Sequence, residues 1–96
     1  MANYLVRVEI YDADYSDYET LHKKMLAIGF YKYIKYSDGK SHDLPSGTYF
    51  GKSSLSPSQI RDKVKSVASP LSSKDPSLFV CKFQASEWSS LLYASE

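Results

Sequence analysis

Hydrophobic and polar residues alternate strictly near the start of the chain. Between Tyr4 and Ile10 every second side chain is apolar, and the charged Arg7 and Glu9 fall between them. A period of two with β-branched residues is typical of a strand that buries one face. Residues 78–83 also alternate, but they carry apolar side chains on both faces. That second pattern predicts a strand that either has a central position or faces a second partner surface, and Cys81 is expected to be a small buried hydrophobe.

Two other segments follow the spacing of a helix. Ser16–Glu19 has the sequence of a capping box, and apolar residues then recur every three or four positions until Gly29. Ser56–Gln59 is a second capping box, followed by the same kind of apolar stripe as far as Pro70. We therefore predict one helix in each of these two segments.

Aromatic residues dominate the stretch between the two predicted helices. Residues 30–36 read Phe-Tyr-Lys-Tyr-Ile-Lys-Tyr, a composition that favours a strand. Asp38-Gly39 is a strong turn signal. Residues 41–45 are expected to be a loop or the irregular start of a further strand, which then covers residues 48–52. The two strands are expected to pair as an antiparallel hairpin with a long tip.

The predicted order is strand, helix, strand, strand, helix, strand. This order is that of the ferredoxin-like α+β fold, βαββαβ, in which two helices cover one face of a four-stranded antiparallel sheet. At 96 residues the chain has the length of a single domain, 1–96. The tail at 86–96 is expected to be a short helix or an edge strand that pairs with another subunit.

Composition and charge exclude several classes of function. Twelve basic against eleven acidic residues give a net charge of +1, so any nucleic-acid binding must come from a local patch. The single cysteine excludes an internal disulfide and a Cys₂His₂ zinc site. With no long apolar run and no secretory signal at the start, we expect a cytoplasmic protein that does not enter membranes.

Two carboxylates follow the first predicted strand. Asp12 and Asp14 are our candidate catalytic residues, because a carboxylate at a strand end can hold Mg²⁺ or position a water for phosphodiester cleavage. Asp12 is the candidate metal ligand, and Mg²⁺ is the only cofactor that the sequence suggests. The alternative is a turn in which both aspartates bond to the backbone.

Basic and aromatic residues interleave in the second predicted strand. Tyr31, Lys32, Tyr33 and Lys35 could bind single-stranded RNA, with bases stacked on tyrosine and phosphates beside lysine. A packed amphipathic strand with solvated lysines is the alternative. Further candidate RNA-binding residues are Arg7 on the first strand and Arg61 on the second helix. For Arg61 the alternative is a solvated helix face.

Three further residues have two interpretations each. His22 flanks the apolar stripe of the first helix and could act as a general acid or base, although a structural role is commoner there. Trp88 in the tail could pack into the core or anchor a dimer interface, where tryptophan is enriched. Leu91 follows Trp88 and is the second candidate interface residue.

Over roughly residues 3–85 the chain resembles the GhoS family in element order and loop length. The segments that carry the resemblance are Tyr4–Asp12, Tyr15–Tyr18, Met25–Phe30, Asp38-Gly39 and Leu44-Pro45. That family comprises small bacterial antitoxins of type V toxin–antitoxin systems, described as endoribonucleases that cleave the messenger RNA of the toxin. The resemblance therefore implies an RNA-cleaving antitoxin.

The GhoS fold is in turn similar to the small nuclease-like subunit of CRISPR adaptation, a ferredoxin-like dimer. In that group a strand ending in Tyr-Asp carries an aspartate associated with metal-dependent cleavage, and Tyr11-Asp12 matches it here. This likeness implies a homodimer with its aspartates facing each other across the axis.

Two hypotheses of different classes follow. The first is a small antitoxin-like endoribonuclease that acts on single-stranded RNA, with DNA not expected as a substrate. Asp12 would hold a metal or position water, and Arg7 or Lys35 would steady the phosphate. The second is a non-catalytic, dimeric protein-interaction module. An Asp12 in a cleft beside basic residues favours the enzyme, whereas an Asp12 bonded into its own turn favours the module.

Overall fold

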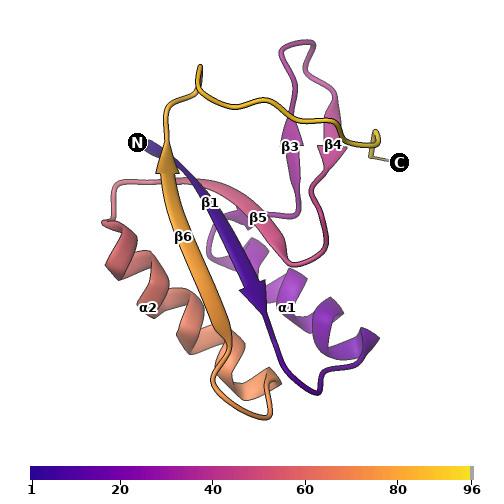
Figure 1. The fold of residues 1–96 in the computed structure, drawn as a ribbon, viewed down its shortest axis with the longest axis vertical. Helices are drawn as coiled ribbons and strands as arrows, with labels where there is room; N and C mark the ends of the chain where they lie inside the picture. Colours follow the sequence, from indigo (N-terminus) through magenta and orange to yellow (C-terminus); the bar gives the residue numbers. More distant parts are fainter. Residues whose placement is uncertain (96) are drawn as a thin grey trace.

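The first strand forms the centre of a four-stranded antiparallel sheet. A computed structural model of the chain describes residues 1–95, and in it β1 (Ala2–Glu9) pairs with β5 (Thr48–Ser53) on one side and with β6 (Ser77–Phe83) on the other. The short β2 (Phe30–Tyr31) adds to the far edge of β5, so the order is β2-β5-β1-β6 (Figure 1). The predicted α+β class and the four-stranded antiparallel sheet are confirmed.

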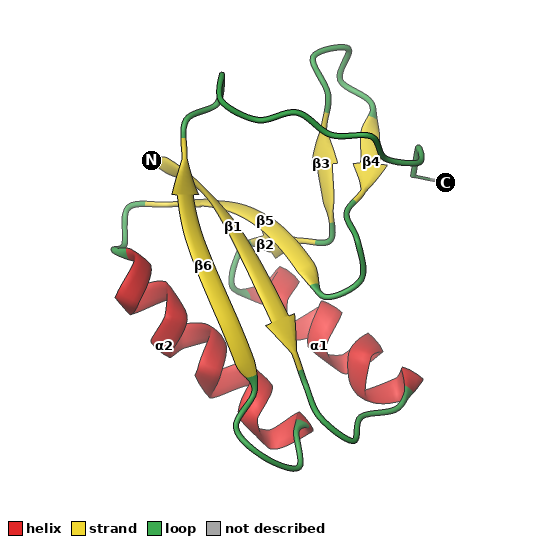
Figure 2. Ribbon diagram, in the orientation of Figure 1, coloured by secondary structure: helices red, strands yellow, loops and turns green. Residues whose placement is uncertain are grey.

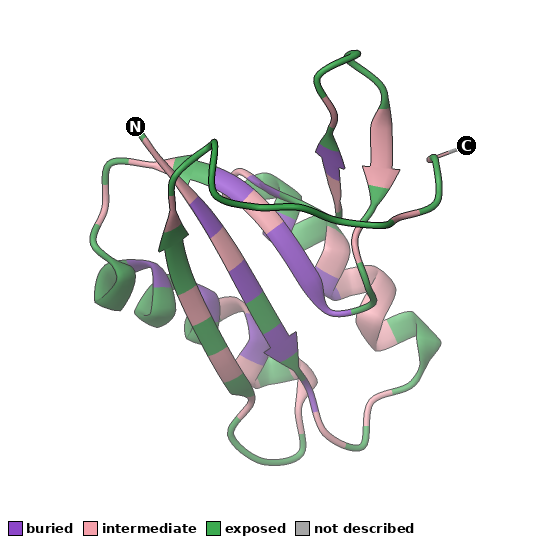
Figure 3. Ribbon diagram, turned by 45° about the horizontal axis from the view of Figure 1, so that its top comes forward, coloured by how far each residue is buried: buried purple, intermediate pink, exposed green. Residues whose placement is uncertain are grey.

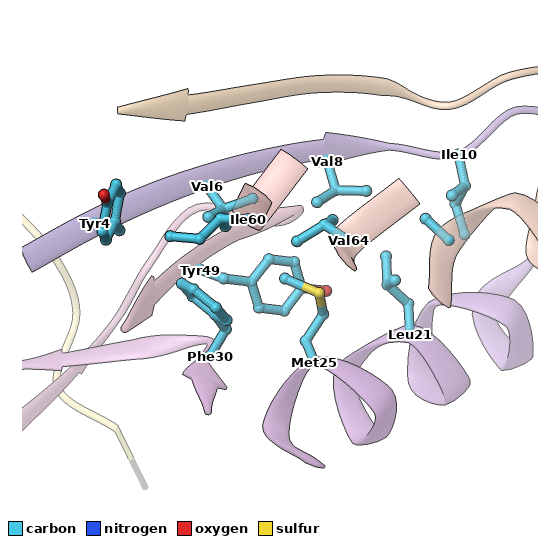
Figure 4. Close-up of a cluster of buried hydrophobic side chains, with 11 residues drawn as sticks. Tyr4, Val6, Val8, Ile10, Leu21, Met25, Phe30, Tyr49, Ile60 and Val64 are labelled. Carbon is cyan, nitrogen blue, oxygen red and sulfur yellow. The ribbon is translucent and has the colours of Figure 1, made fainter. Parts of the chain in front are cut away.

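Both helices lie on one face of this sheet (Figure 2). They are α1 (Tyr15–Ala27) and α2 (Pro57–Ala68), and a short 3₁₀ turn, η1 (Ser69–Leu71), follows α2. The apolar alternation of β1 and the helical stripes meet in the core, where the side chains point toward one another (Figure 4). The core residues exposed to no more than 1% are Tyr4, Val6, Val8, Leu21, Met25, Tyr49, Ile60, Val64 and Ala68.

The helix starts show one correct prediction and one error. Ser56 caps α2 as expected, with its hydroxyl accepting the Gln59 amide and the Gln59 side chain accepting the Ser56 amide. The capping box of α1, however, is formed by Asp14 and Asp17, two residues earlier than the predicted Ser16–Glu19 box. Both pairs have the right spacing, but Ser16 lies inside the helix and donates its hydroxyl to Asp14.

The single strand predicted over residues 30–36 is wrong in detail. The chain bends at Lys32 and divides into β2 and β3 (Tyr33–Lys35), and β3 pairs with β4 (Ser41–Asp43) in a separate two-stranded ribbon. The bend is held by the Leu44 amide, which donates to the Lys32 carbonyl at 2.9 Å. The predicted hairpin therefore exists between β2 and β5, and the ribbon occupies its tip.

The tail after β6 crosses toward the ribbon and runs beside β4 (Figure 1). The Asp43 amide donates to the Tyr93 carbonyl at 3.0 Å, and His42 forms an isolated bridge with Ala94. The short helix considered for 86–96 does not form in the described part of the tail, and its edge pairing is made with its own chain. Residue 96 lies outside the described residues. No helix between residues 1 and 95 has the length and apolarity needed to cross a membrane.

Candidate nucleic-acid interface

The face of the sheet opposite the helices carries a row of apolar side chains. Leu5 on β1 lies directly between Phe50 on β5 and Cys81 on β6 in the strand register. Phe79 is 69% exposed, and Cys81 is exposed rather than buried as predicted. The strand β6 lies at the edge of the sheet rather than at its centre, and Figure 3 shows no buried segment along it. This open face is the surface available to a partner or a substrate.

A groove of about 600 Å³ lies where the open face meets β3 and the tail. Its aromatic walls come from three separate parts of the chain, and two lysines stand beside them. Tyr31 and Tyr33 lie with their ring centroids 5.4 Å apart. The aromatic and basic residues that line this groove include Tyr31, Tyr33, Lys35, Phe50, Lys52 and Trp88.

Trp88 and Tyr31 present exposed ring surface in this groove. Each keeps 38% of its surface accessible, which is large for an aromatic residue that also packs against its own chain. Trp88 is tilted against Tyr36, with 6.2 Å between ring centroids, and Tyr36 is itself stacked on His42 at 3.6 Å. The tail is thus held by aromatic contacts, and a flat ring remains free to stack on a base.

The structure brings together only part of the predicted RNA-binding set. Tyr31, Tyr33 and Lys35 line the groove, and Lys32 lines the adjoining recess. Arg7 lies nearer the other end of β1, where its guanidinium donates to the Val8 carbonyl at 2.9 Å. Arg61 is on α2 in an exposed ion pair with Asp62 at 2.9 Å, on the helix side of the sheet.

Two groove residues were missed by the sequence reasoning. Phe50 and Lys52 lie on β5 and face the groove together with the tyrosines. The alternation of residues 48–52 could have placed them on one face of the third strand, away from the buried Tyr49. Their closeness to Trp88 could not have been found in this way, because it depends on the path of the tail.

Asp12 belongs to a junction of two loops at the far end of β1. Its backbone is in the left-handed region, at φ +52°, and the Ser73 hydroxyl donates to its Oδ2 at 2.5 Å. The neighbouring Tyr11 accepts at its carbonyl from the Ser73 amide and has the Lys74 ammonium 4.4 Å above its ring. Asp12 therefore serves to join the 10–14 and 72–74 loops.

The side chains around Asp12 bear on the predicted Mg²⁺ site, because they would have to supply its ligands. Mg²⁺ is held by carboxylate oxygens with near-octahedral geometry. Among residues 1–95 no group of three or more histidine, cysteine, aspartate or glutamate side chains is placed to hold a metal. The metal site at Asp12 stays a prediction, and the Asp12 carboxylate already accepts a hydrogen bond from the Ser73 hydroxyl.

Asp14 has its carboxylate engaged at the start of α1. It accepts from the Asp17 amide at 3.0 Å and from the Ser16 hydroxyl at 2.7 Å. These bonds, with that of Ser16 the largest cause, lower the pKa of Asp14. An anion at a helix N-terminus is stabilised by the helix dipole, so Asp14 has a structural task here.

His22 lies in a recess of about 230 Å³ beside the groove. Its Nδ1 is 2.7 Å from the hydroxyl of Tyr49, a residue that is fully buried in the core. Burial, and then the charge of Lys32, lower the pKa of His22, whereas Glu19 acts in the opposite direction. Burial also raises the pKa of Tyr49, so its hydroxyl stays protonated.

The two candidate interface residues differ in their surroundings. Trp88 packs over the apolar part of the open face, in a second hollow that Leu5, Cys81 and Phe83 also line. Leu91 is 98% exposed. Trp88 thus has contacts within its own chain, while Leu91 is presented outward.

Comparison with known proteins gives one match. Residues 1–90 match the family model described as Endoribonuclease GhoS. No curated protein sequence matches the chain.

Proposed function

Because the chain belongs to the endoribonuclease GhoS family, we propose that it is an antitoxin-like endoribonuclease that binds and cleaves single-stranded RNA in the groove of the open sheet face. The observation that carries the proposal is the combination of exposed aromatic rings and lysines in one groove of about 600 Å³. That combination suits a flexible strand whose bases can turn toward the protein.

The groove supplies the two interactions that single-stranded RNA requires. The exposed rings of Tyr31 and Trp88 offer flat surfaces, and base stacking on such rings contributes about 1–3 kcal/mol per base. Lys35 and Lys52 lie beside them and can neutralise phosphates. A duplex keeps its bases stacked inside and could not use the rings, so the groove favours single strands.

The position of Asp12 separates two versions of this proposal. β1 is eight residues long, roughly 26 Å, and the groove lies toward its first residues while Asp12 follows its last. For Asp12 to act on RNA in the groove, a homodimer would have to bring the loop of one copy to the groove of the other. We propose the homodimer, with Trp88 and Leu91 at its interface, separately, because covering Trp88 in a dimer would withdraw its ring from RNA.

The ferredoxin-like description and the cytoplasmic location belong to the same proposal. Element order supports the first: with the β3–β4 ribbon set aside, the elements run strand, helix, strand, strand, helix, strand. The antitoxin role rests on membership of the GhoS family alone, and the cytoplasmic location stays a prediction from the sequence.

One feature favours the non-catalytic alternative. Phe79 and Leu91 are 69% and 98% exposed, and large exposed apolar side chains are typical of protein-binding surfaces. A module of this class would dimerise or bind a protein partner through the open face, and it would leave RNA intact.

The test is cleavage of a fluorescent single-stranded RNA by the wild type, Tyr31→Ala and Asp12→Asn, with Mg²⁺ or with EDTA. We expect cleavage by the wild type, a loss of about 5- to 150-fold in Tyr31→Ala because one stacking surface is removed, and much less effect in Asp12→Asn. The same RNA annealed to its complement is the matched control and should be cut poorly. If the purified wild type leaves the single strand intact, the endoribonuclease proposal is wrong and the interaction module is the better account.

A further inference from the structure

The recess that holds His22 is a separate site next to the groove. Its floor comes from α1 and its outer wall from the bend between β2 and β3. The polar and aromatic side chains that line it include Glu19, His22, Lys23, Tyr31, Lys32 and Tyr33. Acid–base, cationic and aromatic groups thus converge on a volume of about 230 Å³, large enough for part of a nucleotide.

His22 is oriented by a buried partner. Its Nδ1 lies 2.7 Å from the Tyr49 hydroxyl, and Tyr49 is fixed in the core. The contact is compatible with two directions: the Tyr49 hydroxyl can donate to Nδ1, or Nδ1 can carry the ring proton and donate it to the Tyr49 oxygen. In the second tautomer Nε2 keeps a free lone pair, and the hydrogen bonds of residues 1–95 engage the ring only at Nδ1. In that tautomer the histidine has the arrangement of a positioned general base.

The charges around the ring suit a phosphodiester. Lys23 and Lys32 line the recess, and Glu19 is the one acidic residue among its lining side chains. Two ammonium groups can neutralise the non-bridging oxygens of a phosphate as negative charge develops on them. Burial and Lys32 also disfavour the protonated imidazole, so the ring is neutral at pH 7 and can accept a proton.

The recess and the groove share a wall. Tyr31 and Tyr33 line both hollows, and their rings are 5.4 Å apart. A strand bound in the groove can therefore pass over these two rings and place its next ribose and phosphate at His22. Asp12, at the far end of β1, has no comparable connection to the groove.

We propose that His22 is the general base of RNA cleavage, accepting the 2′-hydroxyl proton of a nucleotide bound between Tyr33 and Lys32. This inference rests on the proposed endoribonuclease function and names the chemistry of its site.

The reaction is a transesterification within the RNA. Nε2 of His22 takes the proton of the 2′-hydroxyl, and the 2′-oxygen forms a bond to the adjacent phosphorus. The bond between phosphorus and the 5′-oxygen breaks, and its electron pair leaves with that oxygen, which takes a proton from water. The imidazolium then returns its proton to the solvent. The products are a 2′,3′-cyclic phosphate and a 5′-hydroxyl, and no metal or redox partner is needed for the balance.

The experiment compares His22→Gln with Lys24→Gln, which changes an exposed residue of the same helix that does not line the recess. General-base catalysis contributes about 10²–10⁴-fold, so we expect His22→Gln to cut at least about 100-fold more slowly. Binding of the RNA, measured by fluorescence anisotropy, should change by less than about threefold, because we assign base stacking to the tyrosines and only proton transfer to His22. Lys24→Gln should cleave at the wild-type rate, and circular dichroism should show both variants folded.

A second readout does not depend on any variant. Wild-type products should carry 2′,3′-cyclic phosphate ends by mass spectrometry, with or without EDTA. A 2′-O-methyl RNA of the same sequence should bind and remain uncut. Undiminished cleavage by a folded His22→Gln, or products with 3′-hydroxyl ends, would overturn the assignment while leaving the endoribonuclease function intact. Absence of cleavage by the wild type would instead refute the proposed function, and the assignment with it.

Discussion

The lysines of the groove give the most quantitative prediction. Replacing Lys35 and Lys52 together by glutamine removes two cations that we expect to meet RNA phosphates. For single strands the logarithm of the binding constant falls with the logarithm of salt by about 0.7 per neutralised phosphate. The double variant should therefore lose about 1.4 from the slope of the wild type. Between about 50 and about 200 mM salt, wild-type affinity should fall about sevenfold more than that of the variant.

The assay is fluorescence anisotropy of a labelled single-stranded RNA titrated with protein at several salt concentrations. The matched control is Lys63→Gln with Lys65→Gln, which changes the net charge equally on the exposed side of α2. The control should keep the wild-type slope. Parallel slopes for the groove variant and the wild type would refute the assignment of RNA to the groove, and equal losses in both variants would show that only overall charge matters.

Three further predictions concern pH and stability. Cleavage should fall in acid with a midpoint below the ordinary histidine pKa of 6.5, because burial and Lys32 hold the pKa of His22 down; pH–rate profiles should show Lys32→Gln moving that midpoint upward, and an unmoved midpoint would argue against His22. Ser56→Ala should lower the free energy of unfolding by about 1 kcal/mol and the melting temperature by about 4–8 °C, since the α2 cap is lost; an unchanged thermal melt would contradict the cap assignment. Gly51→Ala would place a Cβ 2.6 Å from the Gly29 carbonyl oxygen, so denaturant titration should show a loss of about 1–3 kcal/mol, whereas a neutral result would mean that β2 can shift freely.

Elements with local signals could be predicted from the sequence. The alternation of β1 and the Ser56 capping box depend on residues within a few positions of each other, and both are present as expected. The start of α1 was misplaced because two capping sequences overlap. Starting at Tyr15 lets Asp14 take the cap and leaves Ser16 to donate to it, a choice that propensity alone does not make.

Features that join distant segments could not be predicted. The bend at Lys32 depends on the amide of Leu44, twelve positions away in the sequence, and it turns one expected strand into two. The tail pairs with β4 across about fifty residues of sequence, which places Trp88 at the groove. No local pattern carries that information, so the tail was open to both a helix and an edge strand.

The candidate site residues show the same difference between local sequence signals and contacts between distant segments. Tyr31, Tyr33 and Lys35 were predicted from interleaved aromatic and basic residues, and the structure places all three in the groove. Asp12 was favoured because it follows a strand, but its bond to Ser73 and its distance from the groove depend on the fold. The sequence alone favours a structural role for His22. Its contact with Tyr49 joins residues 27 positions apart, so no local pattern could have indicated it.

The most direct test of the central claim is photo-crosslinking of a single-stranded RNA that carries 4-thiouridine, with the crosslinked peptides identified by mass spectrometry. If RNA lies in the groove, the crosslinks should fall on the peptides that contain Tyr31, Tyr33 and Trp88. Competition with unlabelled RNA should remove them, and duplex RNA should compete poorly. Crosslinks confined to the loops around Tyr11 and Lys74 would place the RNA at Asp12 and contradict the account.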